Sequence, residues 1–237
     1  MCVNLLILRK RDTTERRKTG KKEKMAKLHF FYGVMGAAKS TELIINAYKL
    51  KNSGKQYEVL KPAADNRDSD SEIVSRIGLR EPAKALQNLQ SYIPKEDTQF
   101  ILIDEIQFFS VQDIDILNHI AKDLDKTIFC YGLLIDSNGG KFSASDWLFK
   151  VCNEKHRLEA VCEFQDCRKL ATHHLRFSTK TGDVVRNGNQ VEIGDSKEQS
   201  SDKSFYKSVC PCHFNMAYFK QPSFNWYRYI KEAQRTK

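Results

Sequence analysis

Apolar and polar positions along the chain change repeatedly between two periods, one typical of strands and one typical of helices. Alternating or continuous apolar residues predict strands at 27–32, 57–60, 98–103 and 127–131. Apolar residues at helical spacing predict helices at 39–50, 83–90, 114–121 and 147–151. Strands that alternate with helices imply an α/β fold in which helices flank a parallel sheet. The apolar run at 98–103 is typical of a strand that is buried on both faces of such a sheet.

Changes in composition divide the chain into four expected parts. Residues 1–26 form a basic leader, and residues 27–156 carry the strand–helix pattern, with a polar, turn-rich loop at 61–76. From about Arg157 the pattern gives way to Cys, His, Gly and polar residues, so 157–215 is expected to be a small separate domain. Residues 216–237 form an aromatic and basic tail. Such a tail either packs on the protein or offers a stacking surface to single-stranded nucleic acid.

Most of the net charge of +9 lies in the leader, which holds nine basic and three acidic residues. The overall basicity is therefore weak support for nucleic-acid binding. The leader is interpreted either as an unstructured extension ahead of a start at Met25, or as a basic arm for RNA or a membrane surface.

Two features of the sequence argue against membrane insertion and secretion. The apolar patch at 3–8 precedes the charges, the reverse of a secretory signal, and no window reaches the roughly 20 apolar residues that span a bilayer. Seven cysteines without a secretory signal predict a cytoplasmic protein with reduced thiols.

The segment GVMGAAKS at 33–40 matches the phosphate-loop pattern GxxxxGK[ST] at every fixed position except Ala38, where the pattern has glycine. The segment follows a strand and opens a helix, so its backbone N–H groups are expected to point at phosphates. Lys39 is then the cation for the terminal phosphates, and Ser40 is a hydroxyl ligand for Mg²⁺. Alanine at 38 costs little at helical backbone angles but about 1–2 kcal/mol at positive φ.

Two carboxylates, Asp104 and Glu105, follow the apolar strand at 98–103. In phosphate-loop enzymes an acid at this position holds Mg²⁺. The carboxylate beside it is suited to act as a general base that deprotonates an alcohol. The alternative interpretation is a pair of solvated acids at a strand end, which the neighbouring phosphate loop disfavours.

Cysteine and histidine residues cluster in the second half of the chain, in the pairs Cys162-x4-Cys167 and Cys210-x2-His213. Three thiolates and one imidazole make a closed tetrahedral zinc site of the structural type. Cys212 competes with His213 for the fourth position, and unliganded thiols in a small core are the alternative. A zinc ion at these four residues would anchor both ends of the polar segment 168–209.

Together these motifs resemble the type II, zinc-containing thymidine kinases over roughly residues 27–215. The family's loop pattern, G-x-M-x-[AS]-G-K-[ST], is met at Gly33, Met35, Ala37, Lys39 and Ser40. Further matches are the D-x-R element at Asp65 and Arg67, the D-E-[IVA]-Q-F element from Asp104 to Phe108, the G-L element at Gly132 and Leu133, the later Phe142, the lasso segment at 191–194, and Tyr206.

The resemblance implies ATP-dependent phosphorylation of the 5′-hydroxyl of thymidine, with Glu105 as general base, and a homotetramer. It implies ATP binding by Gly33, Val34, Met35, Gly36, Ala37, Ala38, Lys39, Ser40, Asp65, Asn66, Arg67, Asp104, Glu105, Ile106 and Gln107. It implies substrate binding by Met35, Phe108, Leu133, Ser137, Phe142, Val191, Glu192, Ile193, Gly194 and Tyr206. It implies Mg²⁺ at Ser40 and Asp104, and Zn²⁺ at Cys162, Cys167, Cys210 and His213.

Three departures from the family pattern leave alternatives open. They are Ala38, the four-residue spacing of the first cysteine pair, and Ser137 where many relatives carry an aromatic residue. The alternatives are a nucleoside kinase of altered base specificity, a phosphate-loop ATPase, and a catalytically weak zinc protein that binds nucleic acid.

Overall fold

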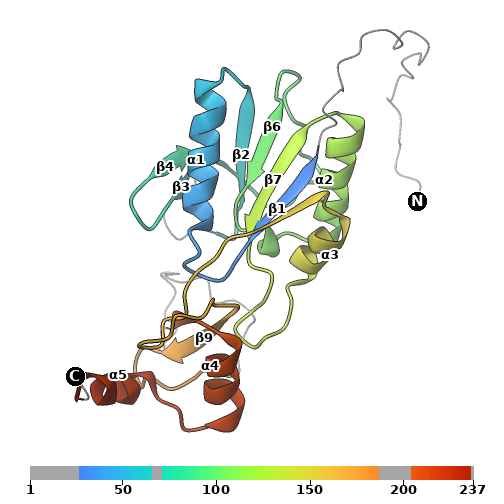
Figure 1. The fold of residues 1–237 in the computed structure, drawn as a ribbon. Coiled ribbons are helices and arrows are strands. Elements are labelled where there is room, and N and C mark those ends of the chain that lie inside the picture. Colours follow the sequence, from blue (N-terminus) through green and yellow to red (C-terminus); the bar gives the residue numbers. More distant parts are fainter. Residues whose placement is uncertain (1–26, 66–70, 187–203, 236–237) are drawn as a thin grey trace.

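The computed structural model describes residues 27–65, 71–186 and 204–235, and its main body is a parallel sheet flanked by helices (Figure 1). The order of the sheet is β5-β2-β6-β7-β1-β8, and every neighbouring pair is parallel. Its strands are β1 (Leu28–Tyr32), β2 (Tyr57–Pro62), β5 (Lys84–Leu86), β6 (Phe100–Ile103), β7 (Thr127–Gly132) and β8 (Glu154–Arg157). The predicted α/β class with a parallel sheet is confirmed.

Helices cover both faces of this sheet (Figure 1). The helical segments are α1 (Lys39–Asn52), the 3-10 turn η1 (Ile106–Phe108), α2 (Val111–Asp123), α3 (Ser143–Val151), α4 (Pro211–Asn215), the π-helical turn η2 (Met216–Lys220) and α5 (Trp226–Arg235). Within the described ranges, no helix combines the length and the apolar character that crossing a membrane requires.

Each of α1, α2 and α3 packs on the sheet through apolar side chains that lie at helical spacing along one of its faces. Leu43 and Ala47 of α1 pack against Leu102 and Tyr131 on one face. Side chains of α2 and α3, together with Phe30, fill the core on the other face. Burial of each Leu, Ile or Phe side chain contributes about 1.5–3 kcal/mol to the free energy of unfolding. The core therefore fixes the ends of β1 and β6, which are followed by the phosphate loop and the acidic pair.

The predicted helix at 83–90 is wrong. Residues Lys84–Leu86 instead form β5, which pairs in parallel with β2 at the edge of the sheet. The predicted loop at 61–76 also contains a strand, β3 (Glu72–Val74), which pairs in antiparallel fashion with β4 (Arg80–Pro82). For β5, backbone pairing with a distant strand outweighs the local propensity of a short segment, whereas β3 and β4 form a local hairpin.

The small domain carries two strands that the sequence pattern did not reveal. β9 (His173–Ser178) and β10 (Ser204–Val209) form an antiparallel pair on which α4 packs (Figure 1). Aromatic residues of the tail, Trp226 among them, enter the same core as Cys162, Phe164 and Phe177. The aromatic part of the tail therefore packs on the protein, as one of its two interpretations predicts.

Candidate active site

The loop between β1 and α1 has a backbone that depends on its glycines. A Cβ at Gly33 would lie 2.6 Å from the carbonyl oxygen of Leu158, and Gly36 has a φ of +81°. Ala38 caps the start of α1 in the left-handed conformation, with φ 57° and ψ 30°. Of the two costs expected for Ala38, the larger therefore applies, about 1–2 kcal/mol. The residue is exposed.

Lys39 is buried, and its ammonium group points back into the loop. Its Nζ donates a hydrogen bond of 2.9 Å to the carbonyl oxygen of Val34. A lysine ammonium group beside the start of a helix makes the loop attractive to anions.

The first turn of α1 is joined to the end of β6. Ser40 Oγ donates a hydrogen bond of 2.8 Å to Oδ2 of Asp104, whose Oδ1 accepts one from the backbone N–H of Glu105. Burial, and then the charge of Glu105, raise the pKa of Asp104 to about 7, although Ser40 and Lys39 oppose the rise. A divalent cation beside this buried carboxyl would displace its proton, so the pair fits an Mg²⁺ site.

Glu105 is buried with a left-handed backbone, at φ 49°. The side-chain amide of Gln107 donates to its Oε2, and Gln107 Oε1 accepts a 3.0 Å hydrogen bond from the backbone N–H of Leu133. A Cβ at Gly132 would lie 2.5 Å from Gln107 Oε1, so glycine is required there. Gln107 thus fixes the glutamate to the loop after β7.

The D-x-R element is only partly visible. Asp65 is buried, and its Oδ2 lies 3.8 Å from Nζ of Lys61. Asn66 and Arg67 lie outside the described residues, as do Val191, Glu192, Ile193 and Gly194 of the lasso segment. Their expected contacts with ATP and substrate stay predictions.

The other predicted substrate residues come from several elements. Leu133, Ser137 and Phe142 are buried in the segment that links β7 to α3, and Phe108 ends η1 half-buried. Met35 is tied to the small domain, because Ser208 Oγ of β10 donates to its carbonyl oxygen. The ring of Tyr206 on β10 lies edge-on to that of His174 at 5.9 Å. The phosphate loop and β10 are thus in direct contact.

His174 is a residue of this region that the sequence analysis missed. It is only 2% exposed, and its Nδ1 has no hydrogen-bond partner among the described residues. Burial, followed by the charges of Lys39 and His173, lowers its pKa to about 3, so the imidazole is neutral at physiological pH. The sequence shows the pair His173-His174, but neither spacing nor pattern distinguishes the buried member from its neighbour.

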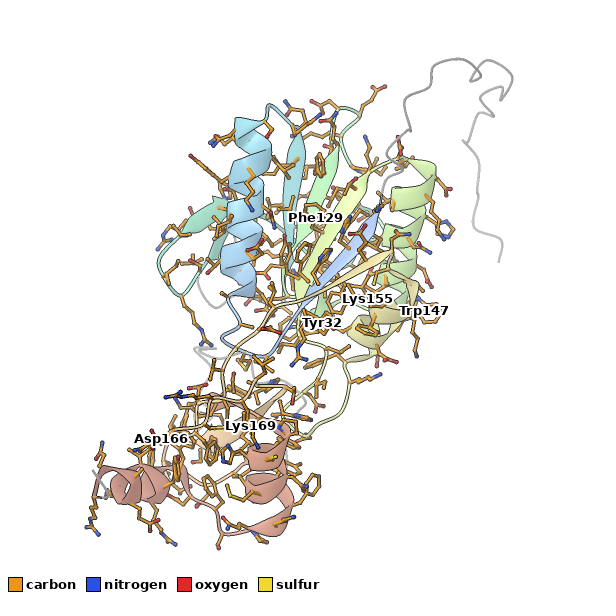
Figure 2. The ribbon with its side chains drawn as sticks, in the orientation of Figure 1. Tyr32, Phe129, Trp147, Lys155, Asp166 and Lys169 are labelled. Atoms are coloured by element: carbon orange, nitrogen blue, oxygen red, sulfur yellow. The ribbon has the colours of Figure 1, made fainter. Side chains whose placement is uncertain are left out.

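A pocket of 180 Å³ lies beside His174, between the phosphate loop and the small domain. Gly33 and Val34 line one side, Ala171 and His174 line another, and Tyr32, labelled in Figure 2, completes the wall from the end of β1. His174 lines this pocket, and its buried Nδ1 lacks a hydrogen-bond partner among the described residues.

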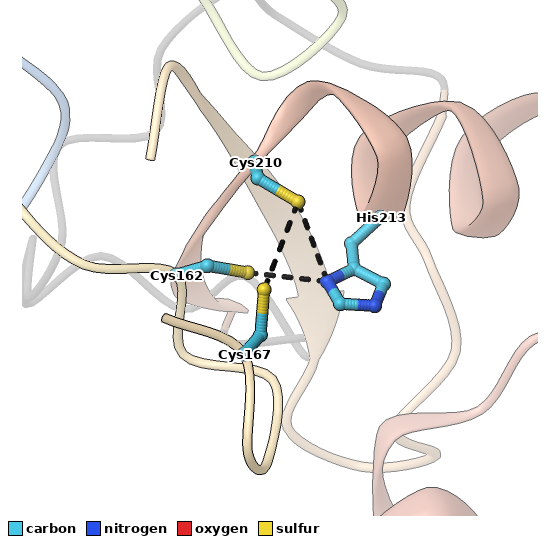
Figure 3. Close-up of side chains that lie close together, drawn as sticks. All are labelled: Cys162, Cys167, Cys210 and His213. Atoms are coloured by element: carbon cyan, nitrogen blue, oxygen red, sulfur yellow. Dashed lines mark hydrogen bonds between the residues drawn. The ribbon is translucent and has the colours of Figure 1, made fainter. Parts of the chain in front are cut away.

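The four expected metal ligands come together in the small domain, as Figure 3 shows. Nδ1 of His213 lies 3.3 Å from Sγ of Cys162 and 3.5 Å from Sγ of Cys210, and the Sγ atoms of Cys167 and Cys210 are 4.0 Å apart. These separations suit a tetrahedral ion at about 2.0–2.3 Å from each ligand. Three thiols and an imidazole therefore form a site of the zinc type.

Cys212 lies outside this cluster. Its side chain is exposed, and its Sγ accepts a hydrogen bond of 3.7 Å from Nζ of Lys169. Of the two residues that compete for the fourth position, His213 is the one whose ring lies beside the three clustered thiols. Its ring stacks on Phe164 at 4.1 Å, which fixes its orientation.

Comparison with known proteins gives consistent matches. The family model described as thymidine kinase matches residues 26–214. A thymidine kinase of Rhodopirellula baltica is 31% identical over 83% of this chain and 92% of its own length. A thymidine kinase of Enterobacteria phage T4 is 33% identical over 81% of this chain and 96% of its own length. A solved structure of the Pif1 helicase from Candida albicans covers 56% of this chain and 36% of its own at 17% identity, and its TM-score of 0.36 is too low to support an argument.

Proposed function

This chain belongs to the thymidine kinase family, and we propose that it transfers the γ-phosphoryl group of ATP to the 5′-hydroxyl of thymidine, giving dTMP. The observation that carries the proposal is the junction of α1 with β6. There a half-buried serine hydroxyl and two buried carboxylates stand beside the lysine of the phosphate loop. That combination is what phosphoryl transfer to an alcohol needs, namely phosphate binding, a metal site and a base.

The phosphate loop holds the nucleotide in this proposal. The backbone N–H groups of 33–40 and the start of α1 bind the phosphates, and Nζ of Lys39 turns from Val34 to the β- and γ-phosphates. Ser40 and Asp104 would hold Mg²⁺, which would supply positive charge to neutralise the transferring phosphoryl group. Asp65, Asn66, Arg67 and Ile106 complete the ATP site by the family resemblance.

Glu105 serves as the general base. Its carboxylate follows directly on Asp104, and the hydrogen bond from Gln107 orients it. In this role Oε1 or Oε2 accepts the proton of the nucleoside 5′-hydroxyl as the oxygen attacks the γ-phosphorus. The left-handed backbone at Glu105 is strained for a residue with a Cβ, and such strain is common where a side chain must be aimed.

The nucleoside lies between the loop after β7 and the small domain. Met35, Phe108, Leu133, Ser137 and Phe142 contribute from the sheet side. The lasso at 191–194 and Tyr206 contribute from the small domain. We add His174 to this set, because it lines the pocket beside the phosphate loop, its ring lies edge-on to Tyr206, and its Nδ1 lacks a partner among the described residues.

We propose a structural role for zinc at Cys162, Cys167, Cys210 and His213. Four protein ligands fill the tetrahedral coordination of the ion and leave no position for substrate. The zinc ion ties the segment before β9 to the one after β10, and so positions both ends of the lasso.

We further propose that 27–156 form the nucleotide-binding domain, 157–215 the substrate domain, and 216–237 a packed tail. The family resemblance supports a homotetramer that acts in the cytoplasm. We expect no membrane partner, and no nucleic-acid partner except through the basic leader.

The test is phosphorylation of thymidine with ATP and Mg²⁺, beside deoxyuridine and deoxycytidine. We expect turnover of thymidine above that of the other two. Preference for another base would point to altered specificity through Ser137. ATP hydrolysis without transfer to any nucleoside would contradict the proposal and favour an ATPase.

A further inference from the structure

Three metal-binding side chains meet at the edge of the sheet, away from the active site. His29 lies near the start of β1, whereas the phosphate loop follows the end of that strand. Parallel pairing places Glu154 of the edge strand β8 opposite His29, and His156 opposite Phe31. Alternate residues of a strand share a face, so Glu154 and His156 project on the same side as His29.

The donor atoms of these side chains lie close together. Nδ1 of His29 is 3.0 Å from Nε2 of His156, and Oε2 of Glu154 is 3.5 Å from the first and 3.6 Å from the second. Ligands bound at about 2.0–2.1 Å around a tetrahedral zinc ion are about 3.3–3.4 Å apart. The three separations bracket that value. The carboxylate oxygen lies beyond normal hydrogen-bond distance from both imidazoles, whereas the two imidazoles are within hydrogen-bond distance of each other.

Neighbouring side chains hold the three donors in place. The ring of Phe31 stacks on His156 at 4.3 Å, and Phe129 of β7 (Figure 2) meets His29 edge-on at 4.9 Å. Lys27 binds Oε1 of Glu154, which leaves Oε2 for another partner. Outer contacts of this kind orient the ligands of metal sites. The His156 and Glu154 side chains are 36% and 39% exposed, so an ion has access from solvent.

We propose that His29, Glu154 and His156 form a second metal site, for a divalent first-row transition ion such as Zn²⁺. Two imidazoles and one carboxylate suit such ions, and a water molecule fills the fourth position. The ion joins the edge strand β8 to β1. The residue after β8, Leu158, donates a 2.7 Å backbone hydrogen bond to Tyr32 and packs against Gly33, so the ion also steadies the support of the phosphate loop.

Equilibrium dialysis of the full chain against excess Zn²⁺, followed by metal analysis, tests the site. We expect two zinc ions per chain in the wild type and one in His156→Gln, with the Cys162 cluster intact in both. Glu154→Gln is a second variant with the same expectation. Because Zn²⁺ joins two strands, it should also raise the unfolding temperature of the wild type more than that of either variant.

His119→Gln is the matched control. His119 is an exposed histidine on α2 that lies 3.3 Å from Asp123, yet this pair offers only two donors. The control should keep both zinc ions. One zinc in the wild type, two in His156→Gln, or an equal loss in His119→Gln would each overturn the proposal. None of these results bears on thymidine phosphorylation, which is measured separately.

Discussion

Ser40 Oγ donates a hydrogen bond of 2.8 Å to Oδ2 of Asp104, and so joins the phosphate-loop helix to the strand that carries the base. The bond favours the charged carboxylate, but burial has the larger and opposite effect, and the pKa of Asp104 rises to about 7. Without nucleotide and metal, this acid is half protonated near neutral pH.

A dependence of stability on pH follows from that raised pKa. Between about pH 4 and 7 the folded chain holds a proton on Asp104 that the unfolded chain releases, so the free energy of unfolding falls as pH rises through this window. Asp104→Asn should remove this part of the pH dependence, which amounts to more than about 1 kcal/mol of unfolding free energy across the window. Urea unfolding across the window checks it. Equal slopes in both proteins would show that Asp104 ionises normally.

Glu105→Gln should lower kcat about 10²–10⁴-fold while ATP affinity stays near the wild-type value. The amide keeps the shape of the side chain and still accepts the hydrogen bond from Gln107, but it is a very poor base. Steady-state kinetics and ATP titration separate the two effects. Glu96→Gln, at an exposed site, is the control and should change neither quantity. Full kcat in Glu105→Gln would remove Glu105 as the base.

Ala38→Gly should stabilise the protein by about 1 kcal/mol, because glycine accepts the left-handed conformation at φ 57° without the steric cost of a Cβ. Ala37→Gly is the matched neighbour. Ala37 is buried at 5% exposure against Val34 and Ala171, and its φ is not positive, so the same change there should destabilise. Chemical denaturation measures both. Loss of stability in both variants would mean that the alanine at 38 is not strained.

The sequence predicted the parallel sheet, the phosphate loop and the metal cluster because each rests on a regular pattern or on fixed spacing. It did not predict β5, since the pairing of Lys84–Leu86 with β2 is a long-range contact of a short segment. Nor did it settle the backbone of Ala38, because both conformations fit the motif. His174 was missed for a related reason. Only the fold shows that His174 lies near the phosphate loop and that its buried Nδ1 lacks a partner in the described part of the chain.

His174→Leu should have opposite effects on stability and on substrate binding. Removing a buried ring nitrogen without a partner should raise the stability of the free protein by roughly 1 kcal/mol. If Nδ1 bonds the nucleoside, the same change should raise KM for thymidine about tenfold or more and leave KM for ATP unchanged.

His173→Leu is the comparison, because His173 is the neighbouring residue of β9. Its ring stacks on Phe214 at 4.5 Å, and its Nδ1 lies 2.7 Å from the hydroxyl oxygen of Thr172. Its loss should therefore destabilise the small domain without changing the KM ratio of the two substrates. Steady-state kinetics with each substrate varied in turn, beside urea unfolding, measure all four quantities. If both variants change KM for thymidine equally, His174 acts only through the packing of β9. If neither variant changes this KM, the ring nitrogen of His174 makes no contact with the nucleoside.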